Sequence, residues 1–150
     1  MLDNTVVPLP GYKTKKQNSV SGLSSGAFMT VQLHIAHSSS FVGAGVIAGG
    51  PYRAAETFRS APTVPMSNIL TSLYVAMTPL TAATAPDVDR LLDLAQDTEN
   101  IDELKNLKGQ RLYLFTGSRD QVVNQHAVRS TKAFYEGLGL AGSALKFVDD

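Results

Sequence analysis

The sequence predicts an α/β fold, in which a parallel sheet is connected by crossover helices. Short apolar segments rich in strand-forming residues alternate along the chain with longer segments whose apolar residues recur at helical spacing. The resulting order is β-α-β-(α)-α-α-β-α-β, and strands that alternate with helices favour a parallel sheet. In such sheets, active sites gather at the carboxyl ends of the strands.

The first half of the chain contains two predicted strands and one predicted helix. Residues 1–16 hold three lysines, two prolines and a glycine, so they are expected to be an irregular lead-in to a domain over residues 17–150. Gln17 to Ser21 is predicted as a strand. Ser25 to about His37 is predicted as a helix with few polar sides, buried on most of its faces. Phe41 to Ala48 is apolar and small, which is typical of a parallel strand covered on both faces.

The second half of the chain contains the remaining elements. Prolines interrupt residues 51–84, where one helix is expected over 66–77. Two amphipathic helices are predicted after it, over Asp87 to Gln96 and Ile101 to Leu107. The last three predicted elements are a strand over Arg111 to Phe115, a helix over Asn124 to Leu138 closed by Gly139, and a strand over Ala144 to Val148.

The composition is that of a globular domain. Hydrophobic residues make up 43% of the 150 residues, and 13 Lys plus Arg balance 13 Asp plus Glu. With no net charge, nothing favours binding to nucleic acid or to an anionic membrane. The chain has no cysteine, so it can form no disulfide and no cysteine-ligated metal site. It also shows no metal-ligand spacing, no phosphate loop, no membrane-spanning apolar run and no signal-peptide pattern at Met1 to Asn4.

One motif carries most of the functional information. Gly22-Leu23-Ser24-Ser25-Gly26 is a G-x-S-x-G placed between a predicted strand and a predicted helix. This is the nucleophile-elbow pattern of serine hydrolases. The glycines let the backbone turn tightly, and backbone N–H groups at the helix start can receive an oxyanion. The alternative is a Gly/Ser-rich turn that only opens a helix.

A second candidate residue follows the third strand. Asp120 comes after Arg111 to Phe115, where α/β-hydrolases carry the acid of a Ser, Asp, His triad. The alternative role for Asp120 is to cap the next helix. The sequence offers no convincing histidine for the base of such a triad. His126 is the only histidine after Asp120, and it falls in the first turn of the next helix. His34 and His37 precede Asp120 and are expected to be packing or surface residues.

Three blocks together resemble one family. They are Ser19 to Met29 (SVSGLSSGAFM), Phe41 to Tyr52 (FVGAGVIAGGPY) and Thr116 to Asp120 (TGSRD). They look like the extracellular poly(3-hydroxybutyrate) depolymerases, whose α/β-hydrolase fold is circularly permuted. The resemblance runs from about residue 17 to the end of the chain, which would be an N-terminal and incomplete part of the catalytic domain.

The resemblance implies roles for individual residues. Ser24 would be the nucleophile, the Ser25 backbone N–H one oxyanion donor and Asp120 the triad acid. The catalytic histidine would lie beyond Asp150, after the last strand, and no cofactor would be needed. The block Gly49 to Tyr52 either lines the substrate pocket or forms only a turn.

The chain departs from this family at its cysteines. Relatives carry a cysteine soon after G-G-P-Y, where this chain has Ala54, and Ala61 and Ala76 also stand at positions compared with cysteines. Either this chain does without the disulfides or they have been removed.

The resulting hypothesis is a serine esterase that acts on poly(3-hydroxybutyrate) or short hydroxyalkanoate esters and is extracellular, as in the family. The alternatives are a feruloyl or acetyl-xylan type esterase, and a truncated hydrolase-fold domain without catalysis. Without a base, these 150 residues are expected to be nearly inactive by themselves. An unpaired sheet edge is also expected to make the monomer marginally stable.

Overall fold

A four-stranded parallel sheet forms the base of the protein. The structure is a computed structural model that describes residues 11, 13, 15, 17–57 and 72–150, so most of the expected lead-in lies outside the described residues. The strands lie in the order β1-β2-β3-β4 and every neighbouring pair is parallel, which confirms the predicted α/β class. The strands are β1 (Asn18–Leu23), β2 (Phe41–Ile47), β3 (Arg111–Thr116) and β4 (Leu145–Asp149).

Three α-helices connect these strands, at the places where the sequence predicts them. They are α1 (Ser25–Ala36), α3 (Val88–Gln96) and α4 (Gln125–Gly137). Short polar side chains begin two of them, because the Asp87 carboxylate accepts from the Arg90 N–H and the Asn124 side chain accepts from the His126 N–H. The shorter turns are η1 (Ser38–Ser40), η2 (Ala54–Glu56), the π-helical η3 (Ser72–Met77), η4 (Ala82–Thr84), η5 (Leu104–Leu107) and η6 (Gly142–Ala144).

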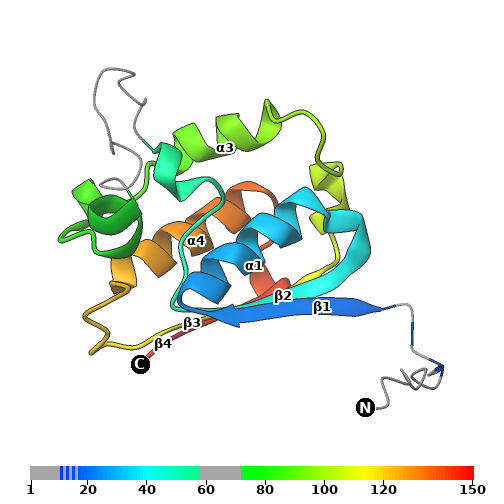
Figure 1. The fold of residues 1–150 in the computed structure, drawn as a ribbon, viewed down its shortest axis with the longest axis horizontal. Helices are drawn as coiled ribbons and strands as arrows, with labels where there is room; N and C mark the ends of the chain where they lie inside the picture. The colour runs from blue at the N-terminus through cyan, green and yellow to red at the C-terminus, as the bar shows by residue number, and fades with distance from the viewer. Residues whose placement is uncertain (1–10, 12, 14, 16, 58–71) are drawn as a thin grey trace, which may run out of the picture.

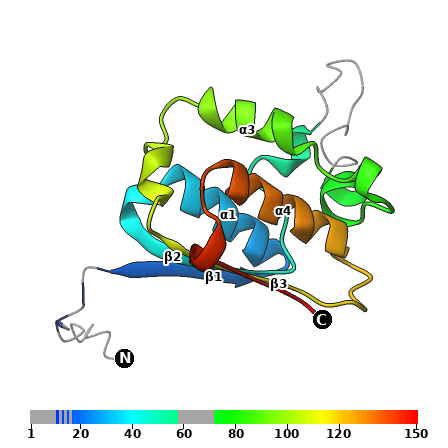
Figure 2. The same cartoon turned by 180° about the vertical axis from the view of Figure 1, so that it is seen from behind.

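The helices all lie on one side of the sheet. Figures 1 and 2 show α1 and α4 packed on the sheet and α3 lying over α4. Right-handed crossovers that advance across a sheet in one direction put every helix on the same face. The expectation that β2 is covered on both faces is therefore wrong for the described residues. The opposite face exposes Leu23 and Tyr113, with 64% and 41% of their surface accessible.

The core lies between the sheet and α1 with α4. Its buried residues include Val46 and Leu114 from the central strands, Val31 and Ile35 from α1, and Phe134 from α4. The prediction that α1 is buried on most faces is only half correct, since the same helix exposes Met29 and Leu33.

Two other expectations differ from the structure in detail. Residues 101–107 do not form a full helix, and only Leu104–Leu107 makes a 3₁₀ turn. The Asp102 N–H donates to the Ala36 carbonyl, and the Asp102 carboxylate accepts from the backbone and hydroxyl of Ser39. These bonds tie the start of the segment to the end of α1. Of the helix expected over 66–77, residues 66–71 lie outside the described residues and the remainder forms η3.

A fully buried histidine joins α1 to α4. His34 lies 2.9 Å from the Tyr135 hydroxyl through Nδ1 and 2.6 Å from Gln110 Oε1 through Nε2. The amide nitrogen of Gln110 donates to the Ser38 and Asn106 carbonyls, so its oxygen must face His34. Nε2 therefore carries the proton, and Tyr135 donates to Nδ1. Burial lowers the pKa of His34 and the Gln110 bond opposes this shift.

We expect acidification below pH 6.5 to destabilise the fold through His34. The unfolded chain takes up a proton near its ordinary pKa of about 6.5, whereas the folded imidazole stays neutral to lower pH. The free energy of unfolding should then fall by up to roughly 1.4 kcal/mol per pH unit between pH 6.5 and the folded pKa. Urea denaturation at several pH values between 5 and 7.5 measures this.

His34→Gln should reduce that pH dependence, and His126→Gln serves as the matched control. An undiminished dependence in His34→Gln would contradict the assignment. If that variant does not fold, an NMR titration of the unmodified protein decides, because burial should make the His34 ring titrate below the ordinary pKa of histidine.

Candidate active site

The turn between β1 and α1 has the geometry of a nucleophile elbow. Ser24 adopts φ 55° and ψ −123°, a conformation that non-glycine residues rarely hold. Its N–H donates to the Ile47 carbonyl at 3.0 Å, which extends the β1–β2 pairing by one residue. Its carbonyl accepts from Ala27 and Phe28 and so begins α1. Such strain, of order 1–3 kcal/mol, persists only where the surrounding structure enforces it.

The two glycines of the motif have unequal roles. A Cβ on Gly22 would stand 2.2 Å from the Gly26 carbonyl oxygen and 2.8 Å from the Ala27 nitrogen. Only glycine therefore lets the end of β1 pass so close to the first turn of α1. A Cβ on Gly26 would meet nothing within 4 Å. The expectation that both glycines let the backbone turn tightly is therefore correct for Gly22, whereas a side chain at Gly26 would clash with none of the described residues.

Asp120 lies in the loop that follows β3, at the same edge of the sheet as the elbow. Its Oδ1 accepts from the N–H groups of Val122 and Val123 at 2.8 and 2.9 Å. This stabilises the loop, but the N-cap of α4 is Asn124, so Asp120 is not the helix cap. Within the described part of the chain, Oδ2 accepts no hydrogen bond.

No histidine of the described residues joins Ser24 and Asp120. His34 is buried in the core and His37 is exposed at the end of α1, as expected for packing and surface residues. His126 is the second residue of α4, and its ring makes no hydrogen bond to Ser24 or Asp120.

The last strand leads the chain back to the Asp120 loop. The Asp150 N–H donates to the Thr116 carbonyl at 3.1 Å, and the Ser118 N–H donates to the Asp150 carbonyl. The end of β4 thus lies against the start of the loop that carries Asp120 (Figure 1).

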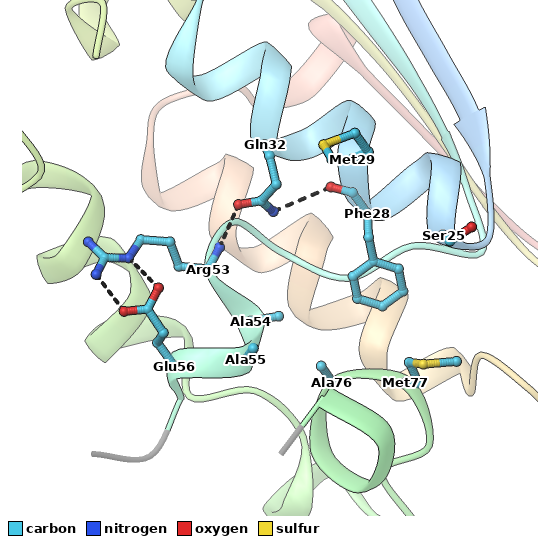
Figure 3. Close-up of a pocket in the computed structure, with 10 residues that line it drawn as sticks. All are labelled: Ser25, Phe28, Met29, Gln32, Arg53, Ala54, Ala55, Glu56, Ala76 and Met77. Carbon is cyan, nitrogen blue, oxygen red and sulfur yellow. Dashed lines mark hydrogen bonds and ion pairs between the residues drawn. The ribbon is translucent and has the colours of Figure 1, made fainter. Parts of the chain in front are cut away.

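A cavity of about 430 Å³ begins beside the elbow at Ser25. Figure 3 shows the Phe28 ring pointing into it, with Ala54 and Met77 on the other side. The remaining lining residues are Met29, Gln32, Arg53, Ala55, Glu56 and Ala76. Of the lining residues, the sequence motif indicates a functional role for Ser25 alone, and Ala54 and Ala76 stand at compared cysteine positions. The signal was partly visible, because Ser25, Phe28, Met29 and Gln32 follow helical spacing from the motif.

The block Gly49 to Tyr52 does not line this cavity, but its glycines pack against Ala27 and against Phe28, which does. A Cβ on Gly50 would lie 2.2 Å from the Phe28 ring, and a Cβ on Gly49 would lie 2.6 Å from the Ala27 side chain. Tyr52 is buried against Phe134. Of the alanines at compared cysteine positions, Ala54 and Ala76 both line the cavity, and Ala61 lies outside the described residues.

A parallel sheet with crossover helices and a strained serine at a strand–helix elbow define an α/β-hydrolase-like protein. No family model matches the chain. Among curated proteins, the chain is 37% identical to a poly(3-hydroxybutyrate) depolymerase of Delftia acidovorans over 138 residues, covering 88% of this chain and 25% of the relative. It is 33% identical to a polyhydroxybutyrate depolymerase of Talaromyces funiculosus over 128 residues, covering 83% of this chain and 33% of the relative.

The solved structures agree with these relatives. A PHB depolymerase from Penicillium funiculosum superposes with a TM-score of 0.71 at 30% identity, over 95% of this chain and 41% of that chain. A PHB depolymerase variant, with a serine replaced by alanine and an R3HB trimer bound, gives a TM-score of 0.70 at 29% identity. The chain belongs to the poly(3-hydroxybutyrate) depolymerase family. It spans a quarter to a third of the length of the curated relatives.

Substitutions at the two motif glycines should have opposite effects. Gly22→Ala forces β1 away from α1 and should lower the free energy of unfolding by about 2 kcal/mol or more, as overpacking does. Gly26→Ala, the matched control, meets open space inside a helix and should be neutral or stabilising by up to about 1 kcal/mol. Chemical denaturation of both variants measures the difference, and equal destabilisation would show that the elbow is not sterically constrained at Gly22.

Proposed function

We propose that this chain carries the nucleophile and the acid of a serine esterase that hydrolyses poly(3-hydroxybutyrate) or short hydroxyalkanoate esters. The observation that supports this most directly is the strained backbone of Ser24. Its hydroxyl makes no hydrogen bond to the described residues, so it stands available at the carboxyl edge of the sheet. The depolymerase relatives support the polyester as substrate.

In the proposed reaction, Ser24 Oγ attacks the ester carbonyl while a histidine accepts its proton. The Ser25 N–H, at the start of α1, stabilises the oxyanion. The histidine returns the proton to the leaving alcohol, and water then hydrolyses the acyl-enzyme. Every proton transfer in the proposed reaction is made by a side chain or by water, and none uses a cofactor.

Asp120 is proposed to orient that histidine. Its Oδ1 is held by two backbone N–H groups, which fixes the carboxylate and leaves Oδ2 to accept from an imidazole. We propose that the histidine lies beyond Asp150. The course of β4 supports this, because a chain continuing past Asp150 starts beside the Asp120 loop.

The family resemblance further favours an extracellular enzyme that works on a polyester. In the described part of the chain, no helix has the length and apolar character needed to cross a membrane.

A fusion tests these roles. The chain is joined at Asp150 to the segment that follows the matching position of the Delftia acidovorans relative, and release of soluble 3-hydroxybutyrate from the polymer is measured. Ser24→Ala and Asp120→Asn in the fusion should each lower the rate by roughly 10⁴-fold or more. Circular dichroism checks that both variants keep the fold. Unchanged hydrolysis in Ser24→Ala would refute the assignment of the nucleophile.

The 150-residue chain by itself should hydrolyse p-nitrophenyl butyrate at a rate near background, because the base is missing. Rapid hydrolysis that disappears in Ser24→Ala would contradict this expectation. It would point to His126 or to a histidine from another chain. A fusion that folds but stays inactive would favour the alternative of a non-catalytic hydrolase-fold domain.

A further inference from the structure

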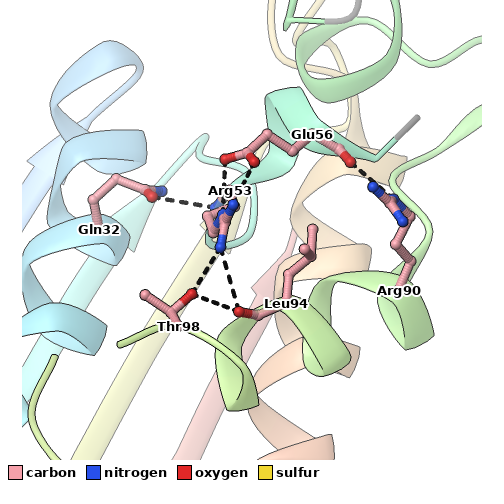
Figure 4. Close-up of polar contacts among 6 residues, drawn as sticks. All are labelled: Gln32, Arg53, Glu56, Arg90, Leu94 and Thr98. Atoms are coloured by element: carbon pink, nitrogen blue, oxygen red, sulfur yellow. Dashed lines mark hydrogen bonds and ion pairs between the residues drawn. The ribbon is translucent and has the colours of Figure 1, made fainter. Parts of the chain in front are cut away.

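The cavity beside Ser25 has a fixed wall opposite α1. That wall is the turn from Arg53 to Glu56, and Arg53 holds it in a left-handed backbone conformation with φ 53°. The Arg53 N–H donates to Gln32 Oε1 at 3.1 Å, which ties the turn to α1. Figure 4 shows Arg53 at the centre of these contacts.

The guanidinium of Arg53 ties the same wall to α3. Its Nη1 group donates to the Leu94 carbonyl at 3.4 Å and to the Thr98 hydroxyl at 2.7 Å. Arg90 of α3 also donates to the Glu56 carbonyl, at 3.0 Å. The turn is therefore anchored on two helices, and the cavity is built into the folded chain.

The charges at this end of the cavity neutralise one another. Arg53 Nε and Nη2 donate to the two carboxylate oxygens of Glu56 at 2.8 and 2.5 Å. This bidentate bond lowers the pKa of Glu56 and keeps it ionised. Among the described lining residues, Arg53 is the one cation, and four of its five side-chain N–H groups already donate to Glu56, Leu94 and Thr98. An anionic ligand would therefore lose its hydration beside an ion pair that carries no net charge, which disfavours its binding.

The rest of the lining suits an aliphatic ligand. Phe28, Met29 and Met77 supply apolar surface, and methionine adapts to chains of different shape. Ala54, Ala55 and Ala76 keep the space open because their side chains are small. The volume of about 430 Å³ lies in the range of small-molecule sites.

We propose that this cavity binds an uncharged aliphatic segment of the ester substrate, one or more hydroxyacyl units long. The cavity extends from Ser25 to Gln32, seven residues or roughly 10 Å along α1. A chain lying there starts at the residue proposed as oxyanion donor, so the proposal rests on the proposed function. Arg53 and Gln32 are positioning residues that hold the wall.

Methionine-methyl NMR of the 150-residue chain tests the proposal. The chain has four methionines, of which Met29 and Met77 line the cavity, and Met→Leu substitutions assign their signals. The probe is the methyl ester of the (R)-3-hydroxybutyrate trimer. Both signals should shift with a common, saturable dependence on its concentration. The free acid of the same trimer should bind more weakly, because its carboxylate would lose hydration beside the neutralised Arg53–Glu56 pair.

Matched alanine-to-leucine substitutions locate the binding. Ala76→Leu fills the cavity and should weaken binding at least tenfold, and Ala55→Leu, on a half-buried lining residue, provides a second filled variant if the first does not fold. Ala133→Leu, on the exposed side of α4, should leave binding unchanged.

Absent shifts at Met29 and Met77, or equal affinity in the filled variants, would overturn the site. Equal or tighter binding of the free acid would overturn the assignment of an uncharged ligand.

Ser24→Ala separates this proposal from the proposed function. Binding by that variant should be unchanged, since Ser24 does not line the cavity. If the trimer ester binds but the fusion hydrolyses polymer without Ser24, the catalytic assignment fails and the cavity assignment stands. If hydrolysis needs Ser24 but the methionine signals do not respond, the cavity assignment fails alone.

Discussion

The close contact between Gly22 and the first turn of α1 controls the rest of the structure. Because residue 22 has no Cβ, α1 starts directly over the end of β1. The short passage between them forces Ser24 into its strained conformation and presents its hydroxyl at the sheet edge. The same start sets the rotation of α1. One side of this helix then contributes Ala27, Val31, His34 and Ile35 to the core, and another lines the cavity with Ser25, Phe28, Met29 and Gln32.

The second constraint lies in the connection between β2 and β3. This connection leaves the sheet after Gly49 and Gly50, whose missing side chains make room for Ala27 and Phe28. Arg53 then fixes the following turn to α1 and α3 by hydrogen bonds. Functional loops are usually held in this way by a rigid scaffold. The elbow and the cavity wall are therefore both attached to α1, and the wall is attached to α3 as well.

The sequence predicted the four strands and the three α-helices because their patterns are local. Runs of apolar residues, their recurrence at helical spacing and the Gly139 that closes the last helix all act within a few residues. Residues 101–107 do not form the predicted helix because Asp102 is hydrogen-bonded to Ala36 and Ser39, more than sixty residues earlier. Their amphipathic pattern could not reveal that competition.

The sequence by itself determined the elbow motif, the strand–helix order and the family, since each is carried by short blocks whose residues are neighbours in the chain. Only the tertiary structure decided that Gly22 and not Gly26 is sterically required, that Asp120 does not cap α4, and that Arg53 closes a cavity beside Ser25. These features depend on contacts between segments far apart in sequence, whose distances and free hydrogen-bonding groups arise only when the sheet and helices pack together.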